Sequence, residues 1–439
     1  MTRLSSPLRV GGVTIPNRLY RAPLLECAGN GDDAVDRLID ALEPAAAAGA
    51  GLVCQGATIV RGDGGCAAPG MTRVHDPEFV ARLGRLTDRI HDHDATVAIQ
   101  LEHGGLRSME TWHAGYRADN PDLRQPAVSR PPWPLRLLDR LGFLSYDPQV
   151  LSTKEVYDLA EEFGRAAGHA ADVGYDLIHV AGANMGIVHQ FLSPFYNRRD
   201  DEFGDGVRFL EAIHDAVRDH AGDVPLVTKV PAETAAPPVI RRHLDRSDAV
   251  EVCRRLDDVG YDALVPVSGS VFWDMSIVRG SFPARAWRDA AFREGYDEAF
   301  GGRLRAGLVA LANRVESWAY DFDPAWNADL CRAVRDAVSV PVWCEGGIRE
   351  RPRIDRLLGD ACDMVGMARP FYAEPELPAR LLANAEASAV CDSCNNCTVP
   401  QVTGAPGVCR TPAVVEQAGR LRRRGAYATG GESESGSEG

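Results

Sequence analysis

Eight short apolar segments, spaced along most of the chain, constrain its fold more than any other feature. Amphipathic stretches separate them, and residues 152–173 open with Ser152 and Glu155 at the spacing of a helix capping box. Short and continuously apolar strands are typical of a parallel sheet that is buried on both faces. The eight segments are Arg18–Ala22, Gly51–Ile59, Thr96–Leu101, Asp176–Val180, Pro225–Val230, Asp262–Val267, Val340–Trp343 and Asp363–Met367. Strand–helix alternation repeated eight times predicts an α/β fold of the (β/α)8 TIM-barrel class.

Two long insertions interrupt this alternation. Residues 113–146 follow the third apolar segment and are rich in proline, arginine and tryptophan, while residues 272–323 follow the sixth. Loops of this length inside a compact domain usually serve as lids or form extra helices. We expect both insertions at the end of the barrel where the strands finish.

The charge and the apolar patterning exclude several classes of protein. The formal net charge of −14 disfavours nucleic acids and anionic membranes as partners, because both repel an acidic surface. No apolar run approaches the length of a membrane span, and the first residues lack the pattern of a signal peptide. We therefore expect a cytoplasmic protein, in which eleven cysteines do not form a disulfide framework.

Four cysteines near the end of the chain form a compact motif. Cys391, Cys394 and Cys397 follow C-x2-C-x2-C spacing, and Cys409 comes later. Three thiolates on one short loop and a remote fourth favour a [4Fe–4S] cluster. Zinc sites more often use two separated C-x2-C pairs, so zinc remains the alternative. We interpret the other seven cysteines as small buried hydrophobic residues.

Glycines follow the last two barrel strands. Gly346 and Gly347 come after the seventh apolar segment, and Gly366 to Arg369 end the eighth. In TIM barrels these two loops commonly bind a phosphate, because glycines let backbone amides approach it and an arginine adds charge. Ordinary turn glycines and a surface arginine are the alternative interpretation.

Several segments resemble the Old Yellow Enzyme group of FMN barrels, and in particular its iron–sulfur branch, which includes 2,4-dienoyl-CoA reductase and trimethylamine dehydrogenase. The resemblance covers about residues 5 to 410. It favours iron–sulfur over zinc for the cysteine motif. The segments are residues 8–18 (LRVGGVTIPNR), 98–105 (AIQLEHGG), 190–200 (QFLSPFYNRRD) and 365–375 (VGMARPFYAEP).

The resemblance implies a set of flavin contacts. Gln100 would hydrogen-bond the pyrimidine edge, and Lys229 stands where the family has an arginine near N1 and O2. A cation there stabilises the anionic reduced flavin. Leu25 replaces the cysteine that links to flavin in the trimethylamine dehydrogenase type, so we expect non-covalent FMN. The remaining implied contacts are Pro23, Leu24 and Ala57 on the isoalloxazine, and Gly346, Gly347, Met367 and Arg369 around the phosphate.

The fourth strand departs from the family pattern. The family's substrate-binding pair and proton-donating tyrosine align with Ala181, Asn184 and Gly186, of which only Asn184 keeps a side chain able to bind a substrate carbonyl. Ene reduction needs a hydride and a proton, so another acid or water must supply the proton. The replacement candidates are His179, which a packed core role also explains, Cys27 in the first loop and Asp274 in the sixth insertion.

Together these features predict an FMN- and [4Fe–4S]-dependent oxidoreductase that reduces an activated alkene such as an enoate, enone or enoyl substrate. One alternative is a dehydrogenase of an amine or saturated substrate that exports electrons through the cluster. A second is a degenerate non-catalytic or zinc-stabilised barrel. No G-x-G-x-x-G unit follows the cysteines, so we expect a small-molecule substrate and a separate redox partner. We expect that partner to be a ferredoxin, an electron-transfer flavoprotein or an NAD(P)H-dependent flavoprotein. NAD(P)H itself is another candidate external electron donor. The family resemblance is also compatible with a homo-oligomer.

These features also divide the chain into three parts. We expect residues 1–382 to form the FMN-binding barrel, and residues 383–425 to form the [4Fe–4S]-binding segment. Residues 426–439, which are rich in glycine, serine and glutamate, are expected to be a disordered acidic tail.

Overall fold

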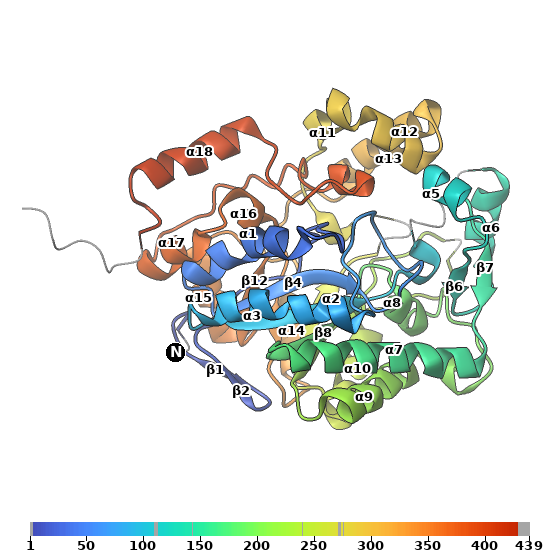
Figure 1. Ribbon diagram of the computed structural model, residues 1–439, viewed down its shortest axis with the longest axis horizontal. Helices are drawn as coiled ribbons and strands as arrows, with labels where there is room; N and C mark the ends of the chain where they lie inside the picture. The colour runs from blue at the N-terminus through green and yellow to red at the C-terminus, as the bar shows by residue number, and fades with distance from the viewer. Residues whose placement is uncertain are drawn as a thin grey trace, which may run out of the picture.

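The eight predicted strands form one parallel sheet in the computed structural model, which describes residues 3–428 except 109–112, 143, 239, 271–273 and 275 (Figure 1). A bridge between Leu264 and Val342 joins the two edge strands, so the sheet closes into a barrel. The strands, in the order in which they pair, are β10 (Ala263–Ser268), β9 (Leu226–Ala232), β8 (Leu177–Val180), β5 (Thr96–Glu102), β4 (Leu52–Ile59), β3 (Leu19–Arg21), β12 (Met364–Met367) and β11 (Trp343–Cys344). The prediction of a TIM barrel is confirmed.

The seventh strand is shorter and begins later than predicted. It covers only Trp343 and Cys344, although the apolar segment begins at Val340. Pro341 has no N–H to donate to a neighbouring strand, which limits regular pairing at this point. Its carbonyl oxygen still accepts a hydrogen bond of 3.0 Å from the Leu264 amide, and this contact helps to close the barrel.

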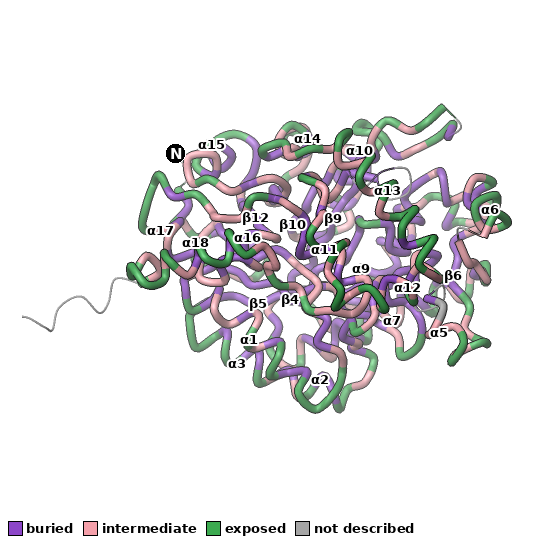
Figure 2. Tube along the Cα trace, turned by 90° about the horizontal axis from the view of Figure 1, so that it is seen from above, coloured by how far each residue is buried: buried purple, intermediate pink, exposed green. Residues whose placement is uncertain are grey.

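The barrel interior is apolar at one end. Leu52, Ala98, Val227 and Trp343 belong to one buried cluster inside the strands, because alternate residues of a strand point to the same face. An antiparallel hairpin of β1 (Leu8–Val10) and β2 (Val13–Ile15) adds Leu8, Val10 and Ile15 to this cluster and covers the end where the strands begin. Figure 2 shows the strands as the buried centre of the molecule. The opposite end, where the strands finish, is the end at which barrel enzymes place their active sites.

Helices surround the barrel as the alternation predicts. The capping box is confirmed at the start of α7: the Glu155 amide donates to Ser152 Oγ at 3.3 Å, and the Ser152 amide donates to Glu155 Oε2 at 2.7 Å. The outer helices are α1 (Ala34–Ala47), α2 (Pro77–Arg82), α3 (Gly84–His91), α7 (Thr153–Asp172), α8 (Ile187–Leu192), α9 (Val207–Ala221), α10 (Arg246–Val259), α14 (Ala328–Arg335), α15 (Arg351–Asp360), α16 (Arg369–Ala373) and α17 (Leu377–Ala383).

Both insertions contain secondary structure of their own. The first carries α5 (Ala114–Asp119) and α6 (Trp133–Arg140), with a parallel pair of short strands, β6 (Gln125–Ala127) and β7 (Pro148–Val150). The second carries α11 (Ala284–Arg288), α12 (Arg293–Phe300) and α13 (Arg303–Ala319). Figure 1 shows these helices on the side of the molecule away from the β1–β2 hairpin, as expected for insertions at the carboxyl ends of the strands.

The chain continues after α17 through the cysteine motif to α18 (Pro412–Arg423). The predicted disordered tail lies outside the described residues from 429 onward, and the predicted domain limits stay predictions. Within the part of the chain that the structure describes, no helix has the length and apolarity needed to cross a bilayer.

The packing inside the barrel makes a prediction about Gly366. A Cβ atom at this position would lie 2.4 Å from the Tyr20 ring, whereas a Cβ at Gly359 in α15 would meet nothing within 4 Å. We expect Gly366→Ala to lower the free energy of unfolding by about 1–3 kcal/mol through overpacking. The control Gly359→Ala should be neutral or stabilising by up to about 1 kcal/mol, because alanine favours helix. Chemical denaturation of both variants measures the difference, and equal stabilities would contradict the packing.

Candidate functional site

A layer of polar side chains lies inside the barrel, between the apolar interior and the carboxyl ends of the strands. Gln100 on β5 and His179 on β8 face each other with 3.1 Å between Nε2 and Nδ1. Lys229 on β9 forms an ion pair with Glu345, which follows β11, with 2.6 Å between Nζ and Oε2. These strands contribute buried polar atoms where a purely structural barrel would place aliphatic side chains.

The carboxylate of Glu345 balances the charge of Lys229. The Lys229 side chain is almost fully buried, and the Tyr20 hydroxyl donates a hydrogen bond to the other oxygen of the same Glu345 carboxylate. Burial and the negative charge of Glu345 raise the pKa of Tyr20 well above its ordinary value, so the phenol keeps its proton. Sequence reasoning identified Lys229 but missed Glu345, although this acid directly precedes the two predicted phosphate-binding glycines.

The Gln100–His179 contact fixes the protonation of the histidine. A carboxamide nitrogen can only donate, so Nδ1 of His179 accepts and Nε2 carries the ring proton. Burial, followed by the charge of Lys229, lowers the pKa of His179 well below its ordinary value, which keeps the ring neutral. That Nε2 atom is buried, and no described residue is its hydrogen-bond partner. Among the described residues, nothing donates to Gln100 Oε1 either.

The loop after β3 crosses the end of β4 at very short range. A Cβ atom at Gly56 would lie 1.2 Å from the carbonyl oxygen of Leu24, so only glycine fits there. A buried ion pair of 2.8 Å between Arg21 and Glu26 holds this loop, and the Gly56 amide donates to Glu26 at 2.9 Å. These contacts bring the predicted flavin neighbours Pro23, Leu24 and Ala57 to one part of the barrel end.

The predicted phosphate loop has an unusual backbone. Gly346 and Gly347 have φ angles of 97° and 65°, and a Cβ on Gly346 would lie 2.7 Å from the Trp326 ring. In the described part of the chain, neither glycine amide donates a hydrogen bond. The guanidinium of Arg279 lies 5.2 Å from the centre of the Trp326 ring, so a second arginine, which the sequence did not single out, is beside this loop.

Arg369 connects the end of β12 with the cysteine motif. Its guanidinium donates to the Asn395 side chain and, at 2.8 Å, to the carbonyl oxygen of Arg279. These contacts do not test whether Arg369 and Met367 lie at the phosphate, so both assignments stay predictions.

The structure brings the four motif cysteines to the wall of one small cavity, together with the cations Arg369 and Arg410. Ser393 and Asn395, between the cysteines, have φ angles of 59° and 60°, so the loop turns sharply around this cavity. Burial raises the pKa of the Cys397 thiol to about 12 in the absence of a bound metal. Across the described residues, no group of three potential ligand side chains is arranged to hold a metal ion, so the cluster stays a prediction.

The cysteine motif packs directly against the loop after β3. The Tyr372 hydroxyl and the Gln401 side chain both donate to the Leu25 carbonyl oxygen, at 3.0 and 2.9 Å. On its other side, the Ser281 amide of the second insertion donates to Ser393 at 3.1 Å. The motif therefore contacts the same loop that carries Pro23 and Leu24.

Asn184 and Cys27 lie at the barrel end in strained backbone. Asn184 and Met185 have φ angles of 66° and 65°, and left-handed residues other than glycine are enriched at functional sites. Asn184 is exposed, and its backbone carbonyl oxygen accepts a hydrogen bond of 2.7 Å from the Arg107 side chain. Cys27 has a φ of 53°, but burial raises the pKa of its thiol to about 12, which disfavours a reactive thiolate.

Asp274 is surrounded by hydrogen-bond donors. Its carboxylate accepts from the Thr234 hydroxyl, from the Tyr320 hydroxyl at 2.7 Å and from the Ser276 amide at 2.9 Å. Through these hydrogen bonds the carboxylate joins three segments of the chain. Its predicted catalytic role is untested.

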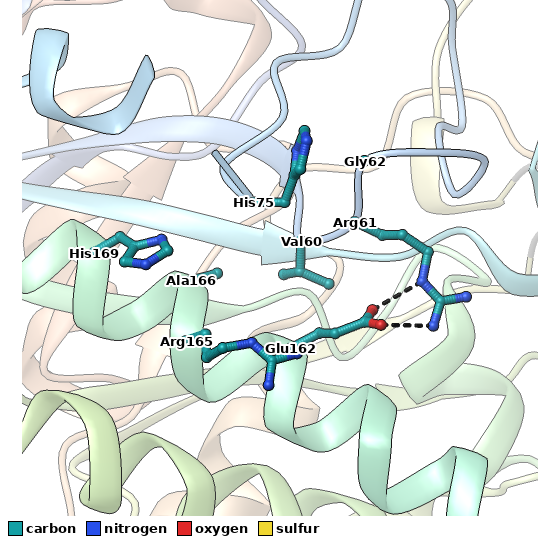
Figure 3. A pocket seen from close by; sticks show the side chains of 8 residues that line it. All are labelled: Val60, Arg61, Gly62, His75, Glu162, Arg165, Ala166 and His169. Atoms are coloured by element: carbon teal, nitrogen blue, oxygen red, sulfur yellow. Dashed lines mark hydrogen bonds and ion pairs between the residues drawn. The ribbon is translucent and has the colours of Figure 1, made fainter. Parts of the chain in front are cut away.

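A separate cavity of about 200 Å³ lies outside the barrel, between the loop after β4 and helix α7 (Figure 3). Arg61 and Glu162 form a two-point ion pair along its wall, with 2.9 and 2.8 Å between their nitrogen and oxygen atoms. His75 and His169 also line it. None of the predicted catalytic or flavin-binding residues does, so the candidate site is the barrel end and not this cavity.

The barrel end fits FMN chemically. An isoalloxazine edge offers hydrogen-bond donors and acceptors, and the buried layer offers the unpartnered His179 N–H and the Gln100 carbonyl oxygen. A phosphate needs donors, and the free amides of Gly346 and Gly347 lie beside Arg279. A buried polar layer near the carboxyl ends of a parallel barrel is where TIM-barrel enzymes place their active sites.

Comparison with known proteins identifies the family. The model of the "NADH:flavin oxidoreductase / NADH oxidase family" matches residues 3–294, which is more than half of the 439-residue chain. The chain belongs to this family, as the resemblance to the Old Yellow Enzyme group implied. It is a flavin-dependent oxidoreductase, and family membership supports FMN as its cofactor.

The individual relatives are distant. The 4,4'-dithiodibutanoate disulfide reductase of Rhodococcus erythropolis is 26% identical over 427 residues, which cover 94% of this chain and 97% of that protein. The metal reductase of Desulforamulus reducens is 25% identical over 406 residues, 90% of this chain but 51% of the relative. A solved complex of 2-naphthoyl-CoA reductase has a TM-score of 0.71 at 16% identity, covers 95% of this chain and 58% of its own, and supports the fold. The chain thus spans about half the length of some relatives and nearly all of another.

Proposed function

We propose that this protein is an FMN- and [4Fe–4S]-dependent reductase of activated alkenes, in which a C=C bond is conjugated to a carbonyl group. FMN, when bound, supplies the hydride for such a reduction. The protein supplies binding, orientation and a proton. The observation that carries the proposal is the neutral Lys229–Glu345 pair in the polar layer.

The Lys229–Glu345 pair favours the reductive direction. A lone buried cation would stabilise the anionic reduced flavin and so weaken it as an electron donor. Here the Lys229 ammonium has a carboxylate 2.6 Å away, and that carboxylate also accepts from Tyr20. The pair still provides a hydrogen-bond donor, but its net charge is close to zero. A less stabilised reduced flavin is a stronger reductant, as a reductase requires.

The other polar groups have distinct roles in this proposal. Gln100 and His179 hydrogen-bond the pyrimidine side of the flavin, and their mutual contact holds both in orientation. Gly346 and Gly347 bind the phosphate through their amides, and Arg369 adds charge. Asn184, exposed at the barrel end, donates to the carbonyl oxygen of the substrate and withdraws electrons from its double bond.

The four cysteines of residues 383–425 would hold a [4Fe–4S] cluster in this proposal. The support is their convergence on one cavity beside Arg369 and Arg410, whose charges offset those of thiolate ligands. The Leu25 carbonyl, bound by Tyr372 and Gln401, links this segment to the loop that carries Leu24. Electrons from a separate redox protein would enter through the cluster, and NAD(P)H is the other candidate donor.

Disulfide reduction is the second candidate, and one observation favours it. The Rhodococcus erythropolis relative matches this chain over nearly the whole length of both proteins, and its name assigns it a disulfide substrate. Reduction of a disulfide also needs two electrons and protons for the leaving thiolates. Both substrate classes can be compared in one reoxidation assay of the reduced flavin.

The role of the buried pair gives a prediction about the flavin potential. Glu345→Gln removes the negative charge beside Lys229, so the reduced flavin should become more stable. We expect the two-electron midpoint potential of bound FMN to rise by about 30 mV or more, which corresponds to about 1.4 kcal/mol. Spectroscopic redox titration measures the change, with the exposed Glu386→Gln variant as a control. An unchanged or lower potential would contradict the proposed position of the flavin.

Metal analysis tests the cluster. Protein purified without oxygen should contain FMN, sulfide and about four irons per chain, with broad absorption near 400 nm. Cys397→Ser should lose most of the iron and sulfide. Cys253→Ser, which changes a buried cysteine of α10, should keep them. Wild-type protein that holds zinc and no sulfide would refute the cluster, and absence of flavin would refute the reductase.

A further inference from the structure

Glu102 is the last residue of β5 and points into the barrel end. Strand alternation places it on the same face as Ala98, which packs in the barrel interior, and Gln100, which contacts His179. Its side chain is only 7% exposed. Carboxylates are rarely buried unless paired, so a buried acid at the carboxyl end of a barrel strand suggests a function.

The Glu102 carboxyl group lies against Gly186, in the loop that follows β8. A Cβ atom at Gly186 would lie 3.3 Å from Glu102 Oε1. Gly186 has ordinary extended angles of −60° and 174°, so its backbone would accept any side chain. Glu102 therefore fills space that a side chain at position 186 would otherwise occupy, and position 186 is where the proton-donating tyrosine was expected and is missing.

Glu102 also lacks the hydrogen bonds that other buried acids of this chain accept. Glu26 pairs with Arg21 at 2.8 Å, and Glu233 accepts from the Ser193 hydroxyl and the Leu244 amide. Among the residues that the structure describes, no donor is hydrogen-bonded to the Glu102 side chain. A carboxylate that accepts no hydrogen bonds gives up no such interaction when it is protonated, and it can then transfer that proton.

The charged groups that act on Glu102 are already engaged elsewhere. Arg107 donates to the Asn184 carbonyl oxygen at 2.7 Å, and Lys229 pairs with Glu345 at 2.6 Å. Burial raises the pKa of Glu102 to about 7, against the opposing pull of Arg107 and Lys229. The acid is therefore protonated in a large fraction of molecules at neutral pH, which suits a general acid.

We infer that Glu102 is the proton donor for the substrate reduced at the barrel end, in place of a side chain at Gly186. This role rests on the proposed function. Bound FMN would supply the hydride for one carbon of the conjugated C=C bond, and Glu102 gives its proton to the neighbouring carbon. The π bond breaks, two C–H bonds form, the flavin is oxidised and the alkene is reduced. The Glu102 carboxylate then takes a new proton from water.

The test separates the two half-reactions of the enzyme. Flavin reduced by dithionite is mixed with 2-cyclohexen-1-one or cinnamaldehyde, and the rate of reoxidation is followed by absorbance in the absence of oxygen. Glu102→Gln should slow this step on the order of 10²–10⁴-fold. Reduction of the oxidised flavin by NADPH or dithionite should change less than about twofold, because no proton from Glu102 is needed there.

The pH dependence gives a readout that a merely structural role would not produce. In the wild type, reoxidation by the alkene should slow about tenfold per pH unit above pH 7, because only the protonated acid can donate. Glu102→Gln should remove this dependence, and Glu102→Asp should keep part of the rate with a shifted midpoint. Glu316→Gln is the matched control, since the pKa of Glu316 in α13 is also raised to about 7 by burial.

A measurement without turnover completes the test. The infrared difference spectrum between pH 6 and pH 8 should lose the carboxyl band of Glu102 in Glu102→Gln and keep it in Glu316→Gln, with the melting temperature confirming an intact fold. An active wild type with an unaltered pH profile in Glu102→Gln would overturn the role of Glu102 alone. Wild-type flavin that no alkene reoxidises would overturn the proposed function and this role with it.

Discussion

The buried ion pair between Lys229 and Glu345 is the interaction on which the barrel end depends. With Tyr20, it connects β9, β11 and β3, three strands that do not pair with one another in the sheet. Burying these charges is costly, and only their close contact and the added hydrogen bond compensate for it. A barrel needs no such group for stability, so its presence at the carboxyl ends of the strands points to the chemistry carried out there.

Two carboxyl groups at this end have opposite environments. Glu345 accepts hydrogen bonds from a cation and a phenol, whereas Glu102 is buried beside Gly186 without a hydrogen-bond donor among the described residues. In the proposed function, the first would tune the charge around the flavin and the second would carry a proton. Such a division of roles between acids is a common way for one site to combine charge stabilisation with proton transfer.

The cysteine motif is attached to the site and not to the outside of the barrel. It is held by the Leu25 carbonyl on one side and by the second insertion on the other. Sequence reasoning named the four cysteines and Arg369 but not the partners of Arg369, which donates to Asn395 of the motif and to the Arg279 carbonyl oxygen. These partners come from segments far apart in the sequence, so only the folded chain brings them together.

The sequence by itself determined the barrel and the family, because these depend on local apolar periodicity and on motifs at the ends of strands. It anticipated the α7 capping box for the same reason, since every contact lies within four residues. The flavin contacts that the sequence implied stay predictions. Only the tertiary structure decided the partners of Lys229 and the surroundings of Glu102. Both depend on which side chains meet across the barrel, and that depends on strand register and burial, which no local pattern records.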